Sequence, residues 1–198
     1  MPDEMLDVVT EDDLPTGQAP RAAVHARGLW HRGVHVFLFD GRGRLLVQKR
    51  SAERVASPSL LDGSVSEHVK AGEDYLDGAR RGLEEELGVS RLDFEPVATF
   101  RMVYGPRDNK ISTLFHAVVD FTDVQFDPEE IEAVAWRGVD ELLEQMKNEP
   151  TAFCGWFVEI LHWYMGTPSA LTVLYEHTRM RFSASGSERP GSVAPTKR

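Results

Sequence analysis

The stretch GEDYLDGARRGLEEELGV at residues 72–89 decides the fold. Its apolar side chains recur at spacings of three, four and four: Leu76, Ala79, Leu83 and Leu87. This spacing places them on one face of an amphipathic helix, which must pack on the rest of the protein. Gly88 follows the last of them, at the position where glycine commonly ends a helix. We therefore predict a helix over residues 73–87.

Glu84, Glu85 and Glu86 form an acidic run in the last turn of this helix. They repel one another and lie near the negative end of the helix dipole, where acidic side chains are disfavoured. Glu85 and Glu86 lie off the apolar stripe and about 100° apart around the axis, so both can face one cleft. An arrangement that costs stability indicates either a solvated surface or a bound cation. Clusters of carboxylate oxygens suit Mg²⁺ or Mn²⁺.

The sequence on both sides of this helix has the patterns of β-strands. Asp40-Gly41-Arg42-Gly43 is a strong hairpin signal between two β-rich runs, at residues 33–40 and 44–48. Residues 51–61 are predicted to be a loop. Further strands are expected at residues 6–10, 62–69, 97–103, 111–121 and 133–137, and further helices at residues 139–146 and 152–164. The prediction is an α+β fold in which mixed strands surround the acidic helix.

The chain of 198 residues is expected to form one domain with extensions. We place the domain at residues 29–180. The segment 1–28 before it could form a strand or a hairpin, and it could also pair across a homodimer. The last residues, SASGSERPGSVAPTKR, are rich in Ser, Gly and Pro, so the tail 181–198 is expected to be flexible.

Composition limits the classes of partner. The formal net charge of −10 argues against a general nucleic-acid binder, because such proteins need basic surface to displace counterions from phosphates. A phosphorylated small molecule remains compatible, since a few local cations and a metal can reverse the local field. No membrane partner is expected, because no apolar run approaches the roughly 20 residues of a membrane helix. The acidic N-terminus lacks the pattern of a signal peptide, and the single cysteine, Cys154, allows no intramolecular disulfide, so we expect a cytoplasmic protein.

The segment 67–89 resembles the Nudix box. That pattern is Gly, five residues, Glu, seven residues, Arg-Glu-aliphatic, any residue, Glu-Glu, any residue, Gly-aliphatic. The positions in register here are Glu73, Arg81, Leu83, Glu85, Glu86, Gly88 and Val89. The resemblance implies a Nudix fold, with a mixed β-sheet sandwiched between α-helices. It also implies a pyrophosphohydrolase that uses Mg²⁺ or Mn²⁺ and cleaves a diphosphate linkage by attack of water at phosphorus.

The same resemblance assigns roles to individual residues. Glu85 and Glu86 would bind the metal. Glu73 would either pair with Arg81, bracing the loop before the helix, or reach a metal itself. The base that takes the proton from water is not fixed by the pattern, and its candidates are Glu85, Glu86, Glu67, Asp108, Glu129 and Glu130.

Two positions depart from the box. Gly82 stands where the pattern has a glutamate, and a glycine inside a helix costs about 1 kcal/mol against alanine. Glu67 stands where the pattern begins with glycine. We hypothesise that Glu67, on a strand facing the helix, restores the missing metal-directed charge and thereby acts as a metal ligand or a catalytic residue. In the alternative, Glu67 points to solvent and the enzyme is weakened.

The chain around the box, from Leu6 to about Tyr164, is similar to the Nudix branch that contains isopentenyl-diphosphate isomerase. The likeness includes Pro15-Thr16-Gly17, the stretch RAAVHARGLWHRGVHVFLFDGRGRLLVQKRS and a late Phe153-Cys154-Gly155-Trp156. That isomerase binds a metal through histidines and glutamates, and the matching histidines, candidates for a second metal site, are His25, His31 and His68. The residues expected to contact a phosphorylated substrate are Arg50, Arg54, Arg81 and Trp156.

Other positions depart from the isomerase. Ser66 stands where that enzyme has its catalytic cysteine, and a hydroxyl cannot easily replace a thiol of much lower pKa. Its active-site tyrosine falls near Met102, and Lys110 replaces one of its two late glutamates, with Asp108 at the other. We therefore predict a hydrolase acting on a nucleotide or another organic diphosphate. An isomerase-like enzyme and a catalytically weak ligand-binding domain, for which Gly82 is the argument, remain the alternatives.

Overall fold

A computed structural model gives the structure of residues 3–121 and 124–177, so the predicted tail 181–198 lies outside the described residues. The strands are β1 (Met5–Val9), β2 (Pro15–Pro20), β3 (Trp30–Asp40), β4 (Leu45–Arg50), β5 (Leu61–Asp62), β6 (Val65–His68), β7 (Glu95–Gly105), β8 (Asp108–Val119), β9 (Ile131–Arg137) and β10 (Thr172–Glu176). The helices are α1 (Arg21–Arg27), α2 (Tyr75–Leu87), α3 (Val139–Asn148) and α4 (Gly155–Tyr164), with a 3₁₀ turn at Pro150–Ala152.

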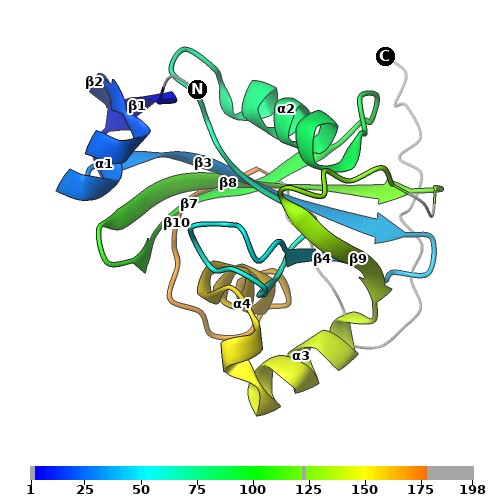
Figure 1. Cartoon of the computed structure of the whole chain (residues 1–198). Coiled ribbons are helices and arrows are strands. Elements are labelled where there is room, and N and C mark those ends of the chain that lie inside the picture. The colour runs from blue at the N-terminus through cyan, green and yellow to red at the C-terminus, as the bar shows by residue number, and fades with distance from the viewer. Residues whose placement is uncertain (1–2, 122–123, 178–198) are drawn as a thin grey trace, which may run out of the picture.

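The strands form one mixed sheet that lies between helices. Helix α2 covers one face, whereas α3 and α4 cover the other (Figure 1). The N-terminal hairpin of β1 and β2 sits with α1 at one end of the sheet (Figure 1). The structure therefore confirms the α+β class and the sandwich arrangement. Within the described part of the chain, no helix is both long and apolar enough to cross a membrane.

Strand β3 lies at the centre of the sheet. It pairs in parallel with β8 along its whole length, from Trp30↔Asn109 to Asp40↔Val119, and antiparallel with β6. Its side chains alternate between the two layers of core. Val34, Val36 and Leu38 pack with α2, while Phe37 and Phe39 pack with α4. A strand buried on both faces reads as a continuous apolar run, as GVHVFLFD does.

Helix α2 begins and ends by local interactions. The side chain of Asp74 accepts a hydrogen bond from the backbone N–H of Asp77, and the Asp77 side chain accepts one from Asp74, which together form a capping box. The helix therefore begins at Tyr75 rather than at residue 73. Gly88 adopts a left-handed conformation with φ of 67° and ends the helix as expected.

Other elements differ from the sequence prediction. Helix α1 was missed because its segment buries only Val24 and so has no apolar periodicity. Strand β10 is an edge strand on β7, and it too was not predicted. The predicted strand 62–69 is divided, because β5 pairs with β4 whereas β6 pairs with β3. The predicted helix 152–164 begins only at Gly155, since the backbone at Phe153 and Cys154 is extended.

The contact of α2 with β6 gives a testable prediction. A Cβ atom at Gly82 would lie 2.8 Å from Cγ1 of Val65, which is fully buried. Alanine normally favours a helix over glycine by about 1 kcal/mol. We expect Gly82→Ala instead to lower the free energy of unfolding by about 1–3 kcal/mol, because the added methyl overpacks the core. Urea denaturation measures this.

The matched control is Glu84→Ala, because Glu84 is an exposed residue of the same helix. It should change the free energy of unfolding by no more than about 0.5 kcal/mol. A Gly82→Ala protein more stable than the wild type would show that α2 and β6 are not packed as described.

Candidate active site

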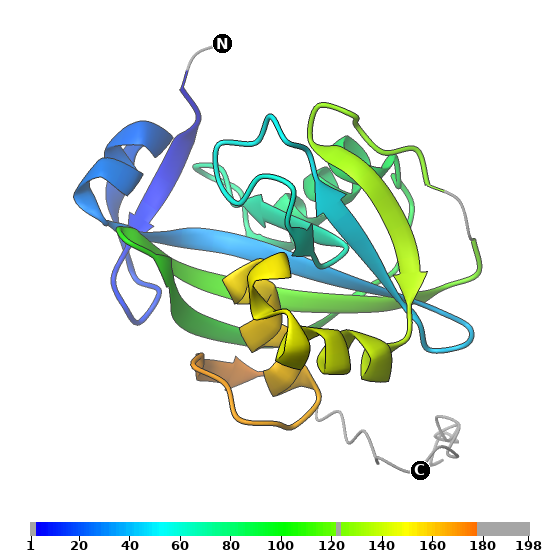
Figure 2. The same cartoon turned by 60° about the horizontal axis from the view of Figure 1, so that its bottom comes forward.

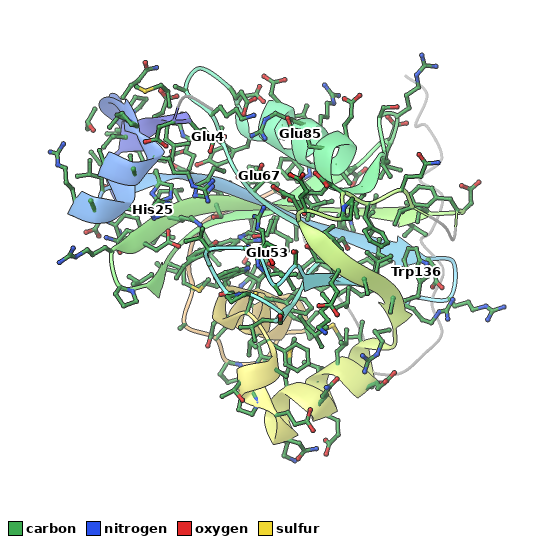
Figure 3. The ribbon with its side chains drawn as sticks, viewed as in Figure 1. Glu4, His25, Glu53, Glu67, Glu85 and Trp136 are labelled. Carbon is green, nitrogen blue, oxygen red and sulfur yellow. The ribbon has the colours of Figure 1, made fainter. Side chains whose placement is uncertain are left out.

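Carboxylates from four parts of the chain, including the N-terminal segment, surround one cavity beside α2. Glu85 comes from α2, Glu67 from β6 and Glu130 from the turn before β9, and they line a cavity of about 390 Å³. The other residues lining it are Asp3, Glu4, Arg21, Arg54 and Lys70. Figure 3 shows Glu67 and Glu85 between α2 and the sheet, with Glu4 on the side of the N-terminal hairpin. We call this space the acidic cavity.

Glu86 adjoins these residues from within the core. Its side chain is buried, and its Oε2 accepts a hydrogen bond of 2.8 Å from Nε2 of Gln48. Its Oε1 has no hydrogen-bond partner among the described residues. Burial, followed by the charge of Glu67, raises the pKa of Glu86 well above its ordinary value. A buried carboxylate oxygen without a donor, next to other carboxylates, fits an oxygen-preferring divalent cation such as Mg²⁺ or Mn²⁺.

The guanidinium of Arg81 holds the surrounding acids together. Its Nη1 lies 3.0 Å from Oε2 of Glu67 and 2.9 Å from Oε2 of Glu85. Its Nε donates to Glu73 at 2.9 Å, and its Nη2 donates to the carbonyl oxygen of His68 at 2.6 Å. Burial alone would raise the pKa of Glu73, but the hydrogen bonds from Arg81 and from the Lys70 backbone hold that pKa below its ordinary value. Of the two roles expected for Glu73, these contacts correspond to the ion pair.

Glu67 occupies space that Gly82 leaves free. A Cβ at Gly82 would lie 3.3 Å from both Cβ and Cγ of Glu67, so the two positions face each other directly. The Glu67 side chain is only 16% exposed and pairs with Arg81, so it points inward rather than to solvent. Glu67, a strand residue, therefore packs directly against the helix position where the Nudix pattern has a glutamate.

Three histidines from different elements lie together near these carboxylates, since Nδ1 of His68 is 3.9 Å from Oε1 of Glu67. His25 of α1, His31 of β3 and His68 of β6 each offer a ring nitrogen, and these atoms lie within 4.8 Å of one another. Nδ1 of His31 donates to the Leu29 carbonyl at 3.0 Å, which leaves Nε2 as an acceptor. That Nε2 lies 3.6 Å from Oδ1 of Asp108, and both atoms are buried with no hydrogen-bond partner in the described chain. Two facing acceptors fit a cation between them.

Lys110 is a buried cation next to this histidine cluster. Its Nζ lies 3.4 Å from Oδ2 of Asp108 and 4.8 Å from the ring centre of Tyr104. Burial lowers the pKa of Lys110 although Asp108 opposes the shift. Burial and then the charge of Lys110 lower the pKa of His31 to about 4, so this histidine is neutral at pH 7.

Tyr104 is a site residue that the sequence analysis did not single out. Its hydroxyl donates to Ser112 at 2.7 Å and so accepts from Nε2 of His35 at 2.8 Å. The tyrosine expected by resemblance fell near Met102, whose side chain is buried in the core. The alternation of side chains along β7 could have indicated Tyr104, because residues two apart in a strand, such as Met102 and Tyr104, share a face.

A second cavity, of about 620 Å³, adjoins the acidic cavity and contains the expected substrate contacts Arg50, Arg54 and Trp156 together with Ser66. Nη1 of Arg50 lies 3.2 Å from Oδ2 of Asp62, and both side chains are buried. Nε1 of Trp156 donates to the same carboxylate at 3.0 Å. Arg54 lines both cavities. Arg81, by contrast, is absent from the described lining of this second cavity, because its donors are used by acids and by a backbone carbonyl.

Comparisons with known proteins identify the family and the fold. The sequence model of the NUDIX domain matches residues 29–157. An isopentenyl-diphosphate Delta-isomerase of Serratia proteamaculans is 34% identical over 162 residues, which cover 80% of this chain and 90% of that protein. An uncharacterized Nudix hydrolase of Streptomyces coelicolor is 40% identical over 136 residues, covering 69% and 74% of the two chains. The solved structure of DR0079 from Deinococcus radiodurans matches with a TM-score of 0.71 and 30% identity, covering 81% of this chain and 98% of that one.

The contacts of Arg81 predict a large effect of its removal. In Arg81→Ala, Glu67, Glu73 and Glu85 lose their shared cation and repel one another. We expect the free energy of unfolding to fall by about 3 kcal/mol in the absence of metal. Added Mn²⁺ should restore part of the loss, because a bound cation neutralises the same carboxylates. Thermal and urea denaturation with and without Mn²⁺ measure both effects.

Arg80→Ala serves as the control, since Arg80 is the neighbouring arginine and is exposed. Its effect should stay within about 0.5 kcal/mol. If Arg81→Ala matched this control and showed no response to Mn²⁺, the acidic cavity would not depend on Arg81.

Proposed function

The chain belongs to the Nudix family, and on that premise we propose that it is a metal-dependent hydrolase of a nucleotide or another organic diphosphate. Members of this family of hydrolases generally cleave diphosphate linkages. The observation that carries the proposal is the unpartnered Oε1 of the buried Glu86, whose carboxylate is close enough to Glu67 and Glu130 of the acidic cavity for their charges to add to the effect of burial in raising its pKa. The cofactor would be Mg²⁺ or Mn²⁺, because all of these donors are carboxylate oxygens.

The roles of the acids follow from their contacts. Glu86, Glu85 and Glu67 would hold the cation, which when bound polarises phosphoryl oxygens and lowers the pKa of coordinated water. Glu73 keeps Arg81 in position and thereby aligns Glu67 and Glu85. Glu73 and Arg81 orient these acids before any substrate binds, so the carboxylates need to move little during the reaction.

The second cavity supplies the substrate contacts in this proposal. Arg54 lies where the two cavities meet, so a diphosphate held by Arg54 would reach the acidic cavity at one end. The organic group would then extend toward Trp156 and Ser66. Arg50 is already paired with Asp62, so it shapes the wall and stacks over Trp156, with its guanidinium carbon 5.6 Å from the ring centre.

A second cation is proposed at His25, His31 and His68, with Asp108 as an oxygen ligand. Its support is the pair of unpartnered acceptors described above, Nε2 of His31 and Oδ1 of Asp108. The buried ammonium of Lys110 shares Asp108 with that site and already neutralises part of its charge.

An isomerase activity is the second candidate, because the Serratia proteamaculans relative is named as one. Isomerisation of a prenyl diphosphate moves protons at carbon and needs an acid and a base around the hydrocarbon. In this chain Ser66 lines the cavity where the resemblance places a cysteine, and Lys110 stands at the position of a glutamate. We favour hydrolysis, because the carboxylates expected for it are present, whereas the cysteine and one of the two late glutamates of the isomerase are replaced by Ser66 and Lys110.

The test of the function is a panel of nucleoside, sugar and prenyl diphosphates assayed with Mg²⁺ and Mn²⁺. We expect metal-dependent release of phosphate or a monophosphate product from at least one compound. Glu86→Gln and Glu85→Gln should each lower kcat/KM by about 100-fold or more, since each removes a metal-directed charge. Glu84→Gln is the control, because Glu84 is exposed and adjacent.

Each contrary outcome points to a different function. Full activity in Glu85→Gln and Glu86→Gln would show that Glu85 and Glu86 do not hold the catalytic metal. Conversion of isopentenyl diphosphate to its isomer would establish the second candidate. Stabilisation by a nucleotide without any turnover would indicate a ligand-binding domain.

The hypothesis that Glu67 replaces the glutamate missing at position 82 of the helix can be tested separately. Glu67→Gln and Glu67→Ala should weaken Mn²⁺ binding and lower turnover by about 10–100-fold, because a charged ligand of the cation is lost. Glu84→Gln and Glu84→Ala are the matched controls, since Glu84 is an exposed carboxylate of α2 that lines neither cavity. Unchanged Mn²⁺ affinity and turnover in both Glu67 variants would show that Glu67 does not replace the missing acid.

A further inference from the structure

We propose that Glu130 takes the proton from the attacking water, and that Arg54 holds its carboxylate until a diphosphate substrate draws Arg54 away. This inference rests on the hydrolase function proposed above. It concerns the one role that the Nudix pattern leaves unassigned in this chain.

The backbone places Glu130 firmly beside the acidic cavity. The N–H of Asp127 donates to the carbonyl oxygen of Glu86 at 3.1 Å, which ties the turn before β9 to α2. The N–H groups of Glu130 and Ile131 both donate to the carbonyl of Asp127, and Ser51 donates to the carbonyl of Glu130 at 2.9 Å. In Figure 2 the loop between β4 and β5, in cyan, lies beside the chain that leads into β9.

The acids around the cavity differ in how tightly they are held. Glu67 accepts from the backbone N–H of His68 through one oxygen and from Arg81 through the other. Paired contacts of this kind also hold Glu73 with Arg81 and Lys70, Glu85 with Arg81 and Lys70, and Glu4 with Arg21 and Lys70. Among the described residues, the side chain of Glu130 forms a single ion pair, with Arg54. A single event can therefore free the carboxylate of Glu130.

Arg54 is the residue that a diphosphate would contact first. Its Nη1 lies 2.5 Å from Oε1 of Glu130, and it lines both cavities. A guanidinium offers five donors in a planar fork that matches phosphate oxygens in pairs. A diphosphate carries more negative charge than one carboxylate, so it competes with Glu130 for Arg54. Substrate binding then leaves the carboxylate of Glu130 unpaired at the wall of the acidic cavity, where it can accept a proton from the attacking water.

The chemical step is balanced with these groups. The water oxygen forms a new bond to phosphorus while one of its protons passes to the carboxylate of Glu130. The bond from phosphorus to the bridging oxygen breaks, and its electron pair leaves on the departing phosphate. Product release returns Arg54 to Glu130 once the proton has passed to solvent.

The test compares Glu130→Gln with Glu129→Gln, because Glu129 is the exposed neighbour and does not line either cavity. Glu130→Gln should lower kcat by about 100- to 10,000-fold, while KM and Mn²⁺ affinity stay within a factor of about three. Glu129→Gln should behave as the wild type. Added formate should restore part of the kcat of Glu130→Ala, which a merely structural role of Glu130 would not allow.

Arg54 gives an independent readout. Arg54→Ala should raise KM by about 10- to 100-fold, the effect of losing one charged hydrogen-bonding group on the substrate. Its kcat should stay within a factor of about five, because Glu130 remains available as the base.

Three results would overturn the inference. A kcat of Glu130→Gln equal to that of the wild type would show that Glu130 is not the base. Loss of Mn²⁺ affinity together with activity, without rescue by formate, would make Glu130 a metal ligand instead. A wild-type protein that hydrolyses none of the diphosphates would contradict the hydrolase function itself, and this result is visible before any substitution is made.

Discussion

The guanidinium of Arg81 lies between carboxylates that would otherwise repel one another. It contacts Glu67 on β6, Glu73 in the loop before α2 and Glu85 on the helix itself. Through its bond to the carbonyl of His68 it also ties the helix to β6. The shared guanidinium offsets the repulsion within this cluster of acids, and Lys70 adds a second cation beside Glu85. The spacing of the acids, and with it the site, depends on that cation.

The acidic cavity also depends on a steric match between α2 and β6. The absence of a side chain at Gly82 lets Val65 and Glu67 approach the helix closely. Helix propensity alone would disfavour glycine there, but the close approach explains it. The two departures from the Nudix pattern therefore lie next to each other in space, because Glu67 on the strand packs directly against Gly82 on the helix.

The arrangement of the two cavities explains how one scaffold can have relatives named for hydrolysis and for isomerisation. For either reaction, a diphosphate bound as we propose would lie near Arg54, where the two cavities meet. What differs is the chemistry on either side. Here the side toward α2 has Glu67, Glu85 and a buried Glu86, whereas the side toward Trp156 has a serine and a lysine at the positions where the isomerase resemblance expects proton-transfer groups. In the function that we propose, this difference favours attack of water at phosphorus.

The sequence by itself determined the acidic helix, its cap at Gly88, the central strands and the family, because helix periodicity, turn glycines and a spaced motif are local properties. It also identified Glu67 and Gly82 as departures, but it did not decide whether Glu67 points inward. That depended on the pairing of β6 with β3 and on the packing of α2 against β6. Tyr104, Gln48 and Asp62 belong to no motif, and their contacts join residues far apart in the chain. Only the tertiary structure decided these contacts, because strand register and helix packing set distances that local patterns do not contain.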